Sequence, residues 1–324
     1  LHLSIRRQRQ MCIRDSFLIS ERVRCISPFF FGVGQSAPRY GGQAVIEGIM
    51  IRGQNNVAIS VRAPSGDIVT RVKKINTLFT GKLRSIPIIR GVIALAETLS
   101  LGMEALNYSS QVANDEEDTP PGKFSSAIMI LISLSIAIGL FFILPLVVSK
   151  PFEGLLGSDV VSNVAEGIIR LAVFLIYVTV ISLMPDIRRV YMYHGAEHMA
   201  VHAQEKGDPL TIQEIRKYPP AHPRCGTAFL LTIMVIAIIV FTLIPREPLW
   251  LVVGSRIVLI PLIASLSYEF IRFNSKYETN KFVSKMSVPS LLLQSLTTKI
   301  PDDDQNEVAI NAMESAIDAD RDLE

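Results

Sequence analysis

Cysteine, histidine and charge are all scarce in this sequence of 324 residues. Its three cysteines, Cys12, Cys25 and Cys225, form an odd and scattered set, which excludes a disulfide framework and is typical of thiols kept reduced on the cytosolic side. Charged residues make up only 19% of the chain against 49% hydrophobic residues, a balance that favours a membrane protein over a soluble domain. The net charge is only +2, without the excess of basic residues that nucleic-acid-binding proteins carry, so we expect no nucleic acid among the partners.

The beginning of the chain is uninformative about the fold. The stretch Gln8-Arg-Gln-Met-Cys-Ile-Arg-Asp15 resembles translated sequencing-adapter read-through, so residues 1–20 are interpreted as an artefact and carry no weight for fold or function. We expect residues 1–37 as a whole to be unreliable or disordered.

Residues 38–123 have the character of a soluble, membrane-proximal region. Segments rich in β-branched residues at 57–62 and 68–72 flank a turn, and this pattern predicts a β-hairpin. Residues 88–110 predict a helix with two glutamates seven positions apart, hence on one face. We expect this helix to lie in the membrane interface; the alternative, that it crosses the bilayer, places the N-terminal region outside.

Long apolar runs come after this region. Three carry few or no charges and a fourth contains an arginine, and each is long enough to cross about 30 Å of hydrocarbon. They predict a mainly α, polytopic helical membrane protein with about four transmembrane helices, embedded in the lipid bilayer, and a small N-terminal α+β element. The predicted spans are residues 124–149, 164–184, 225–245 and 250–268. The bundle therefore covers residues 124–270, and residues 271–324 form a tail with an amphipathic surface helix at 308–317.

Lysine and arginine are distributed unequally between the loops. The loop at 186–224 carries six of them and the segment after the fourth span carries four, whereas the two opposite loops carry one each. Because cytoplasmic loops are enriched in these residues, we expect the loop at 186–224 and both termini to lie in the cytoplasm, and the spans in the cytoplasmic membrane.

Histidine is concentrated in that same loop. Four of the five histidines fall between His194 and His222, and three of them, His194, His198 and His202, are spaced to share one face of a helix. Neighbouring imidazoles at this spacing can hold one divalent metal, and zinc is the ion we expect. The outer pair is about 12 Å apart on a straight helix, so a third ligand must come from elsewhere or His202 must have another role.

The segment His194-Gly-Ala-Glu-His198 matches the H-x-x-E-H pattern of inverted zincins. In that pattern the two histidines bind zinc and the glutamate is the general base for a bound water, a role that falls here to Glu197. A distal carboxylate must then complete the metal shell, and Glu269 at the end of the fourth span is the best-placed candidate. The pattern predicts a zinc-dependent, protease-like hydrolase with a cytoplasm-facing site and a membrane-associated substrate or protein partner.

A second interpretation uses the pair His222 and Cys225. Together with His194 and His198 they can form a closed four-ligand zinc site, which is structural, and the protein is then a non-catalytic membrane scaffold. The histidines can also be simple polar residues beside lipid headgroups, and Cys225 a small buried apolar residue. Transport is a weaker third class, because few charges lie within the predicted spans.

Glu47 lies in a glycine-rich stretch, Tyr40-Gly-Gly-Gln-Ala-Val-Ile-Glu-Gly-Ile-Met-Ile-Arg-Gly53. Its four glycines indicate tight turns or close backbone approach. Two interpretations of Glu47 remain open: a catalytic acid or base (or a ligand) at the metal site, or a turn residue paired with Arg52 or Arg90.

Four motifs together carry a family resemblance. They are Gly41-Gly-Gln-Ala-Val-Ile-Glu-Gly-Ile-Met-Ile-Arg-Gly53, Tyr193-His-Gly-Ala-Glu-His198, His222-Pro-Arg-Cys-Gly-Thr227 and Pro301-Asp-Asp-Asp-Gln-Asn-Glu307. The sequence between about residues 38 and 315 resembles the YqhQ-like family, a bacterial membrane-protein family of unknown function that is sometimes labelled a predicted metal-dependent enzyme. The resemblance implies a bacterial membrane location and favours the metal interpretation, and it implies no substrate.

Overall fold

The computed structural model describes residues 40–76, 86–115, 123–223, 225–277, 280–286 and 288–322. All of them belong to one compact unit, residues 37–324. The expectation about residues 1–37 falls outside the described residues. The described chain is mainly helical, as expected, with one small antiparallel sheet near its beginning.

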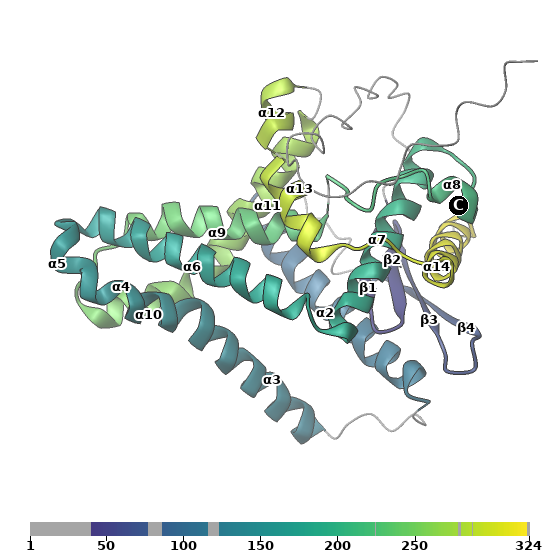
Figure 1. Cartoon of the computed structure of the whole chain (residues 1–324), viewed down its shortest axis with the longest axis horizontal. Coiled ribbons are helices and arrows are strands. Elements are labelled where there is room, and N and C mark those ends of the chain that lie inside the picture. The colour runs from purple at the N-terminus through teal and green to yellow at the C-terminus, as the bar shows by residue number, and fades with distance from the viewer. Residues whose placement is uncertain are drawn as a thin grey trace, which may run out of the picture. The chain divides into compact units, whose positions relative to one another are not determined.

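The sheet has four strands in the order of the chain: β1 (Gly41–Val45), β2 (Gly48–Arg52), β3 (Asn56–Arg62) and β4 (Ile68–Lys74). The predicted hairpin is confirmed as β3 and β4, with Arg62 paired to Ile68 beside the turn. The glycine-rich stretch, which indicated only turns, forms β1 and β2 (Figure 1). Glycine allows these strands to pair because a side chain at position 42 or 48 would collide with a carbonyl oxygen of the neighbouring strand.

Helices cover both faces of the sheet. On one face α2 (Ile89–Ala113) packs against Met50, Val57 and Ile59. On the other, α7 (Pro185–Lys206) and α14 (Asp303–Arg321) pack against Ile49 and Ile51. Successive residues of β2 therefore enter opposite cores, which explains why Ile49, Met50 and Ile51 are all apolar instead of alternating with polar residues.

The helix expected at 88–110 is confirmed as α2, and its two glutamates do lie on one face. Glu97 accepts a hydrogen bond of 2.7 Å from Arg52 of β2, and Glu104 accepts one of 2.8 Å from Lys73 of β4. These ion pairs fix α2 to the sheet. Among the described residues, α2 is not one of the helices that are long and apolar enough to cross a membrane.

The amphipathic surface helix expected at 308–317 is confirmed as part of α14, whose polar face is exposed at Glu307, Glu314 and Asp318. Its apolar face is fully buried against the sheet and α7: Val308, Ala309, Ala312, Met313 and Ala316. At its far end, the carboxylate of Asp320 accepts hydrogen bonds from the backbone N–H groups of Gln54 and Asn55. A helical pattern reveals which face is apolar, but not that a sheet far away in the sequence lies against it.

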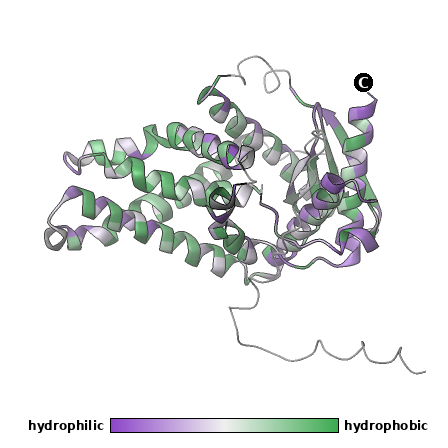
Figure 2. Cartoon of the chain, turned by 90° about the horizontal axis from the view of Figure 1, so that it is seen from above, coloured by the Kyte–Doolittle hydropathy of each residue, from purple (hydrophilic) through white to green (hydrophobic). Residues whose placement is uncertain are grey.

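The apolar helices form a second group of elements (Figure 2). Two helical segments are long and apolar enough to span a membrane, Leu131–Phe152 and Asp159–Ile181, and Trp250–Val258 with Ile260–Asn274 is a third only if this pair, bent by 46°, is one span. The described residues thus support two or three spans where four were predicted. The predicted span at 225–245 contains a helix of 17 residues, which is about 25 Å long and short of the hydrocarbon thickness. Pro261 at the start of the second half accounts for the bend in the pair.

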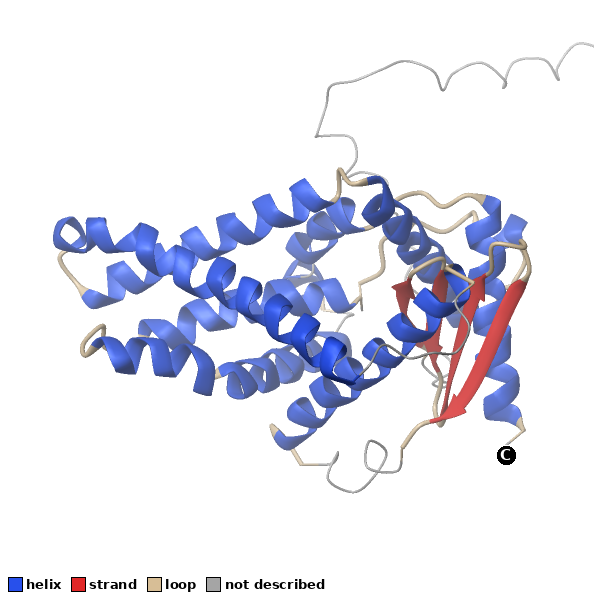
Figure 3. Ribbon diagram, turned by 90° about the horizontal axis from the view of Figure 1, so that it is seen from below, coloured by secondary structure: helices blue, strands red, loops and turns tan. Residues whose placement is uncertain are grey.

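The remaining elements are all helices or helical turns. They are α3 (Lys123–Ile138), the π-helical turn η2 (Gly139–Ile143), α4 (Leu144–Ser149), the 3-10 turn η3 (Lys150–Phe152), α5 (Glu153–Leu156), α6 (Asp159–Ile181), α8 (Ile212–Ile215), α9 (Gly226–Thr242), α10 (Leu249–Val258), α11 (Ile260–Lys276), α12 (Lys281–Met286) and α13 (Val288–Thr297). Figure 3 shows that the strands lie together among helices.

A buried network of charges ties the apolar helices together. Glu166 of α6 is 1% exposed, and its carboxylate accepts hydrogen bonds from Arg170 at 2.5 Å, Arg246 at 2.9 Å and Arg256 at 3.1 Å. Arg256, the charge within the predicted fourth span, therefore faces the bundle interior. One carboxylate shared by three guanidinium groups makes Glu166 the centre of this network.

Candidate metal centre

Helix α7 carries most of the predicted site, and its sequence explains its length. Pro185 and Asp186 occupy the first turn. Proline suits this turn because its N–H groups have no partner within the helix, and the helix dipole favours the negative charge of the aspartate. At the other end Gly207 adopts a left-handed conformation with φ 74° and ends the helix. The middle of the helix is buried, so its polar residues must find partners inside the protein.

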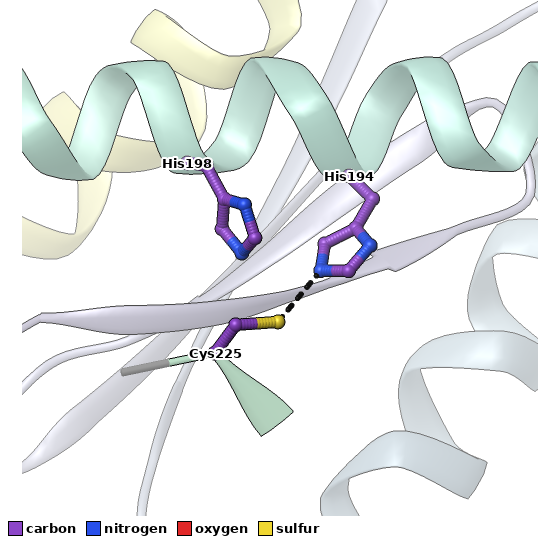
Figure 4. A group of neighbouring side chains, drawn as sticks. All are labelled: His194, His198 and Cys225. Carbon is purple, nitrogen blue, oxygen red and sulfur yellow. Dashed lines mark hydrogen bonds between the residues drawn. The ribbon is translucent and has the colours of Figure 1, made fainter. Parts of the chain in front are cut away.

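The first group of potential ligands consists of His194, His198 and Cys225. Their ligand atoms all lie within 4.8 Å of one another, and the Nε2 atom of His194 is 3.1 Å from the Sγ atom of Cys225 (Figure 4). Cys225 is the N-cap residue of α9, and its sulfur accepts a hydrogen bond from the backbone N–H of Thr227. A backbone donor of this kind stabilises a thiolate.

Backbone carbonyls orient both imidazoles. The Nδ1 atom of His194 lies 2.8 Å from the carbonyl oxygen of Thr297, and that of His198 lies 2.7 Å from the carbonyl oxygen of Pro220. A carbonyl oxygen can only accept, so Nδ1 carries the proton in each ring and Nε2 keeps its lone pair. This is the arrangement that metal-bound histidines usually have, because the second hydrogen bond selects the tautomer and the ring orientation.

The protonation state of His198 also suits a ligand. Burial lowers the pKa of His198 below its ordinary value, although a hydrogen bond with Cys225 opposes this. The imidazole is therefore neutral at pH 7, and a neutral imidazole is the form that binds metal.

Glu197 lies beside this group without joining it. Its side chain is buried, its Oε2 atom is 3.4 Å from the Nε2 atom of His198, and its carboxylate accepts a hydrogen bond from the backbone of Gly42 in β1. A Cβ atom at position 42 would stand 2.9 Å from the Cγ atom of Glu197, so the close approach requires glycine. Burial raises the pKa of Glu197, while His194 and His222 oppose the rise. A carboxyl group with a raised pKa is suited to exchange protons near neutral pH.

A second group of potential ligands lies further along the helix and consists of His202, Glu205 and His222. The Nε2 atom of His222 is 3.3 Å from a carboxylate oxygen of Glu205. His202 is thus placed apart from the first group, in line with the argument that one ion cannot be reached by all three histidines of the helix. The structure also places His222 here, and not with Cys225 in the closed four-ligand set.

Glu269 and Glu47 join neither group among the described residues. The carboxylate of Glu269 forms an ion pair with Arg90, so it is not positioned to complete the shell around His194 and His198. Glu47 lies in the turn between β1 and β2 with φ 50°, forms an ion pair with Arg189, and accepts a hydrogen bond of 3.1 Å from the Tyr193 hydroxyl. These contacts favour the turn interpretation of Glu47, with a different arginine from the two expected.

Sequence reasoning missed three contributors to the site. Glu205 had a signal, since it follows His202 by three positions and therefore shares its helix face. The carbonyl groups of Thr297 and Pro220 had none, because every residue carries a carbonyl and only the folded chain shows which ones meet a histidine.

Comparison with known proteins places the chain in a family. A family model described as a protein of unknown function, DUF1385, matches residues 86–319, which include α7, both groups of ligands and most of α14. The chain belongs to the DUF1385 family. It is 31% identical over 290 residues to the uncharacterized protein YqhQ of Bacillus subtilis (strain 168), which covers 85% of this chain and 91% of the relative. No solved structure matches the chain.

The match confirms the resemblance to the YqhQ-like family. The DUF1385 description names no activity, substrate or cofactor. The chemistry of this DUF1385 protein therefore has to be inferred from the geometry of its own residues.

Proposed function

We propose that this DUF1385 protein is a membrane-bound, zinc-dependent hydrolase whose metal is held by His194, His198 and Cys225. The observation that supports the proposal best is the orientation of the two imidazoles, since both donate Nδ1–H to backbone carbonyls and direct Nε2 towards one thiol. Two nitrogens and one sulfur are a donor set that zinc prefers. Cys225 takes the place in the shell that the sequence assigned to Glu269.

The proposed chemistry depends on the number of ligands. Three protein ligands leave a fourth position open, and zinc in such a site lowers the pKa of water enough for attack at neutral pH. Glu197, whose Oε2 atom is 3.4 Å from the Nε2 atom of His198, would serve as the base for such a water, and its raised pKa suits that role. The apolar helices that adjoin the site favour a substrate that is itself associated with the membrane.

One specific observation favours a different function, a scaffold with a structural zinc site. The ring centroids of His198 and His222 are 5.8 Å apart, so a fourth potential ligand lies beside the first group. A closed set of four ligands leaves no position for water. The two functions differ in what they require of Glu197, and this difference provides the test.

We expect His198→Ala and Cys225→Ser to abolish the thiolate-to-cobalt absorption band that the purified protein shows after Co²⁺ substitution. The reason is that the band requires Cys225 as a ligand, and that loss of one of three ligands leaves the site too weak to hold the ion. Glu197→Gln should keep the band but fail to complement a Bacillus subtilis strain without YqhQ. Glu214→Gln, which removes only an exposed ion pair with Lys217, is the control and should keep both properties.

Glu197→Gln has a further expected effect on the metal-free protein. Because the folded-state pKa of Glu197 lies above its ordinary value of 4.5, the stability that its protonation contributes is fully present below about pH 4.5 and is lost as the pH rises through the folded-state value. The variant should therefore be more stable than wild type at pH 7.

Full complementation by Glu197→Gln together with failure of His198→Ala would support the scaffold instead.

The proposal also assigns an orientation, with the metal centre in the cytoplasm. The six basic residues between 186 and 224 favour this side. A cysteine introduced at the exposed Lys206 should resist a membrane-impermeant maleimide in intact cells and react after permeabilisation. Ready labelling in intact cells would mean that the site faces outwards.

A further inference from the structure

We propose that His202, Glu205 and His222 form a second site for a divalent first-row transition metal, next to the first. This inference goes beyond the proposed hydrolase, because it uses none of the residues of the first group and does not require zinc there. The three ligand atoms lie within 4.8 Å of one another, which is the spacing that a single ion can bridge.

The helix supplies two of these ligands and a loop supplies the third. His202 and Glu205 are three positions apart on α7 and share one face, a spacing that places a histidine and a glutamate on one ion in helical metal proteins. His222 lies on the loop before α9, with its ring centroid 4.4 Å from that of His202. Two imidazoles and one carboxylate are a donor set typical of Zn²⁺ and Fe²⁺.

The protein holds this loop firmly. The side chain of Gln294 on α13 is fully buried, accepts a hydrogen bond of 2.8 Å from the His222 backbone N–H and donates one of 2.8 Å to the His222 carbonyl. The Nε2 atom of His202 lies 3.0 Å from the carbonyl oxygen of Ala221. Because that oxygen can only accept, Nε2 carries the proton, and the Nδ1 atom keeps a lone pair that can bind a metal ion.

Three consecutive loop residues thus serve both groups. Pro220 orients His198 of the first group, Ala221 orients His202 of the second, and His222 is itself a ligand of the second. A loop that only had to pack against α7 would not need each of these contacts. The simpler interpretation, a contact of His222 with Glu205 alone, needs neither His202 nor its carbonyl partner.

Cobalt titration of the full chain in detergent, after removal of metal with a chelator, tests the inference. We expect wild type to bind two equivalents of Co²⁺, of which one produces the thiolate band. Glu205→Gln and His202→Ala should each lower the affinity for one Co²⁺ equivalent by at least about 100-fold and leave the thiolate band unchanged. A loss of this size exceeds what the loss of a residue that only supports a ligand costs. Glu214→Gln, which removes an exposed ion pair with Lys217, is the control and should keep both equivalents.

The outcomes separate the two proposals. One equivalent in wild type, unchanged by Glu205→Gln, would overturn the second site. A thiolate band that is absent from wild type, with one equivalent still lost in Glu205→Gln, would overturn the first site and support the second. Glu205 is partly exposed, and glutamine keeps its shape, so a folded variant is expected.

Discussion

Replacing Glu166 by alanine is expected to destabilise the folded protein by about 3–5 kcal/mol, the cost of breaking a buried ion pair by removing one partner. Arg170, Arg246 and Arg256 all donate to this carboxylate, and each is nearly buried. Without it, Arg170 still donates to the Phe141 carbonyl and Arg256 to neutral side-chain oxygens, but neither of these contacts balances a buried positive charge. Unfolding in mixed detergent micelles, followed by fluorescence of the single tryptophan, Trp250, measures the effect.

Two controls make this result specific. Glu153→Gln removes the other carboxylate that binds Arg246, but Glu153 is 37% exposed, so its loss should cost less than about 1 kcal/mol. Glu166→Leu combined with Arg256→Met should recover part of the stability, because one of the two buried charges left unpaired, that of Arg256, is removed as well. Equal effects of Glu166→Ala and Glu153→Gln would contradict a central role for Glu166.

Gly195→Ala is expected to destabilise the protein by about 1–3 kcal/mol, as overpacking of a well-packed interior does, although alanine is ordinarily the better helix residue. A Cβ atom at this position would lie 2.1 Å from the carbonyl oxygen of Lys299. That oxygen belongs to the backbone and cannot rotate away, and the neighbouring Lys299 N–H is itself bonded to the Tyr191 carbonyl at 2.9 Å. The segment after α13 must therefore move away from α7.

This movement should also reach the metal centre, because the Thr297 carbonyl that orients His194 lies two residues earlier. We expect Gly195→Ala to lower cobalt affinity at the first group as well as stability. Gly226→Ala is the matched control: position 226 has open space around a Cβ atom, and the substitution should be neutral. Unchanged stability and affinity in Gly195→Ala would show that the close approach of the two segments is not required.

Local patterns predicted the elements whose signal is contained in a short window. The hairpin of β3 and β4, helix α2 with Glu97 and Glu104 on one face, and the shared face of His194 and His198 arise from periodicities of two and of 3.6 residues. Glycine hid β1 and β2, because its frequency normally indicates turns, and here it instead permits backbones and Glu197 to approach. No periodicity distinguishes these two uses of glycine.

The metal ligands were predictable by residue type but not by grouping. The sequence placed Cys225 among the candidate ligands. Whether Cys225 groups with His194 or with His222 depends on where the chain returns after α7. In the same way, Glu269 was a reasonable ligand until Arg90, 179 positions away, proved to be its partner. The described residues support two or three spans where composition predicted four, because composition registers the total length of an apolar run and neither the 17-residue length of α9 nor the bend between α10 and α11.

The position of α14 against the sheet has a consequence for how the protein is made. The sheet is complete at Lys74, but the helix that covers one of its faces begins at Asp303, roughly 230 residues later. At a synthesis rate of about 5–20 residues per second, the ribosome needs on the order of 10–50 seconds to deliver it. During this interval Ile49, Ile51 and Ala58 lack part of their apolar cover, while the apolar helices between them and α14 are being translated. The nascent chain therefore cannot mature in the order of its sequence, because this core stays incomplete until α14 has been made.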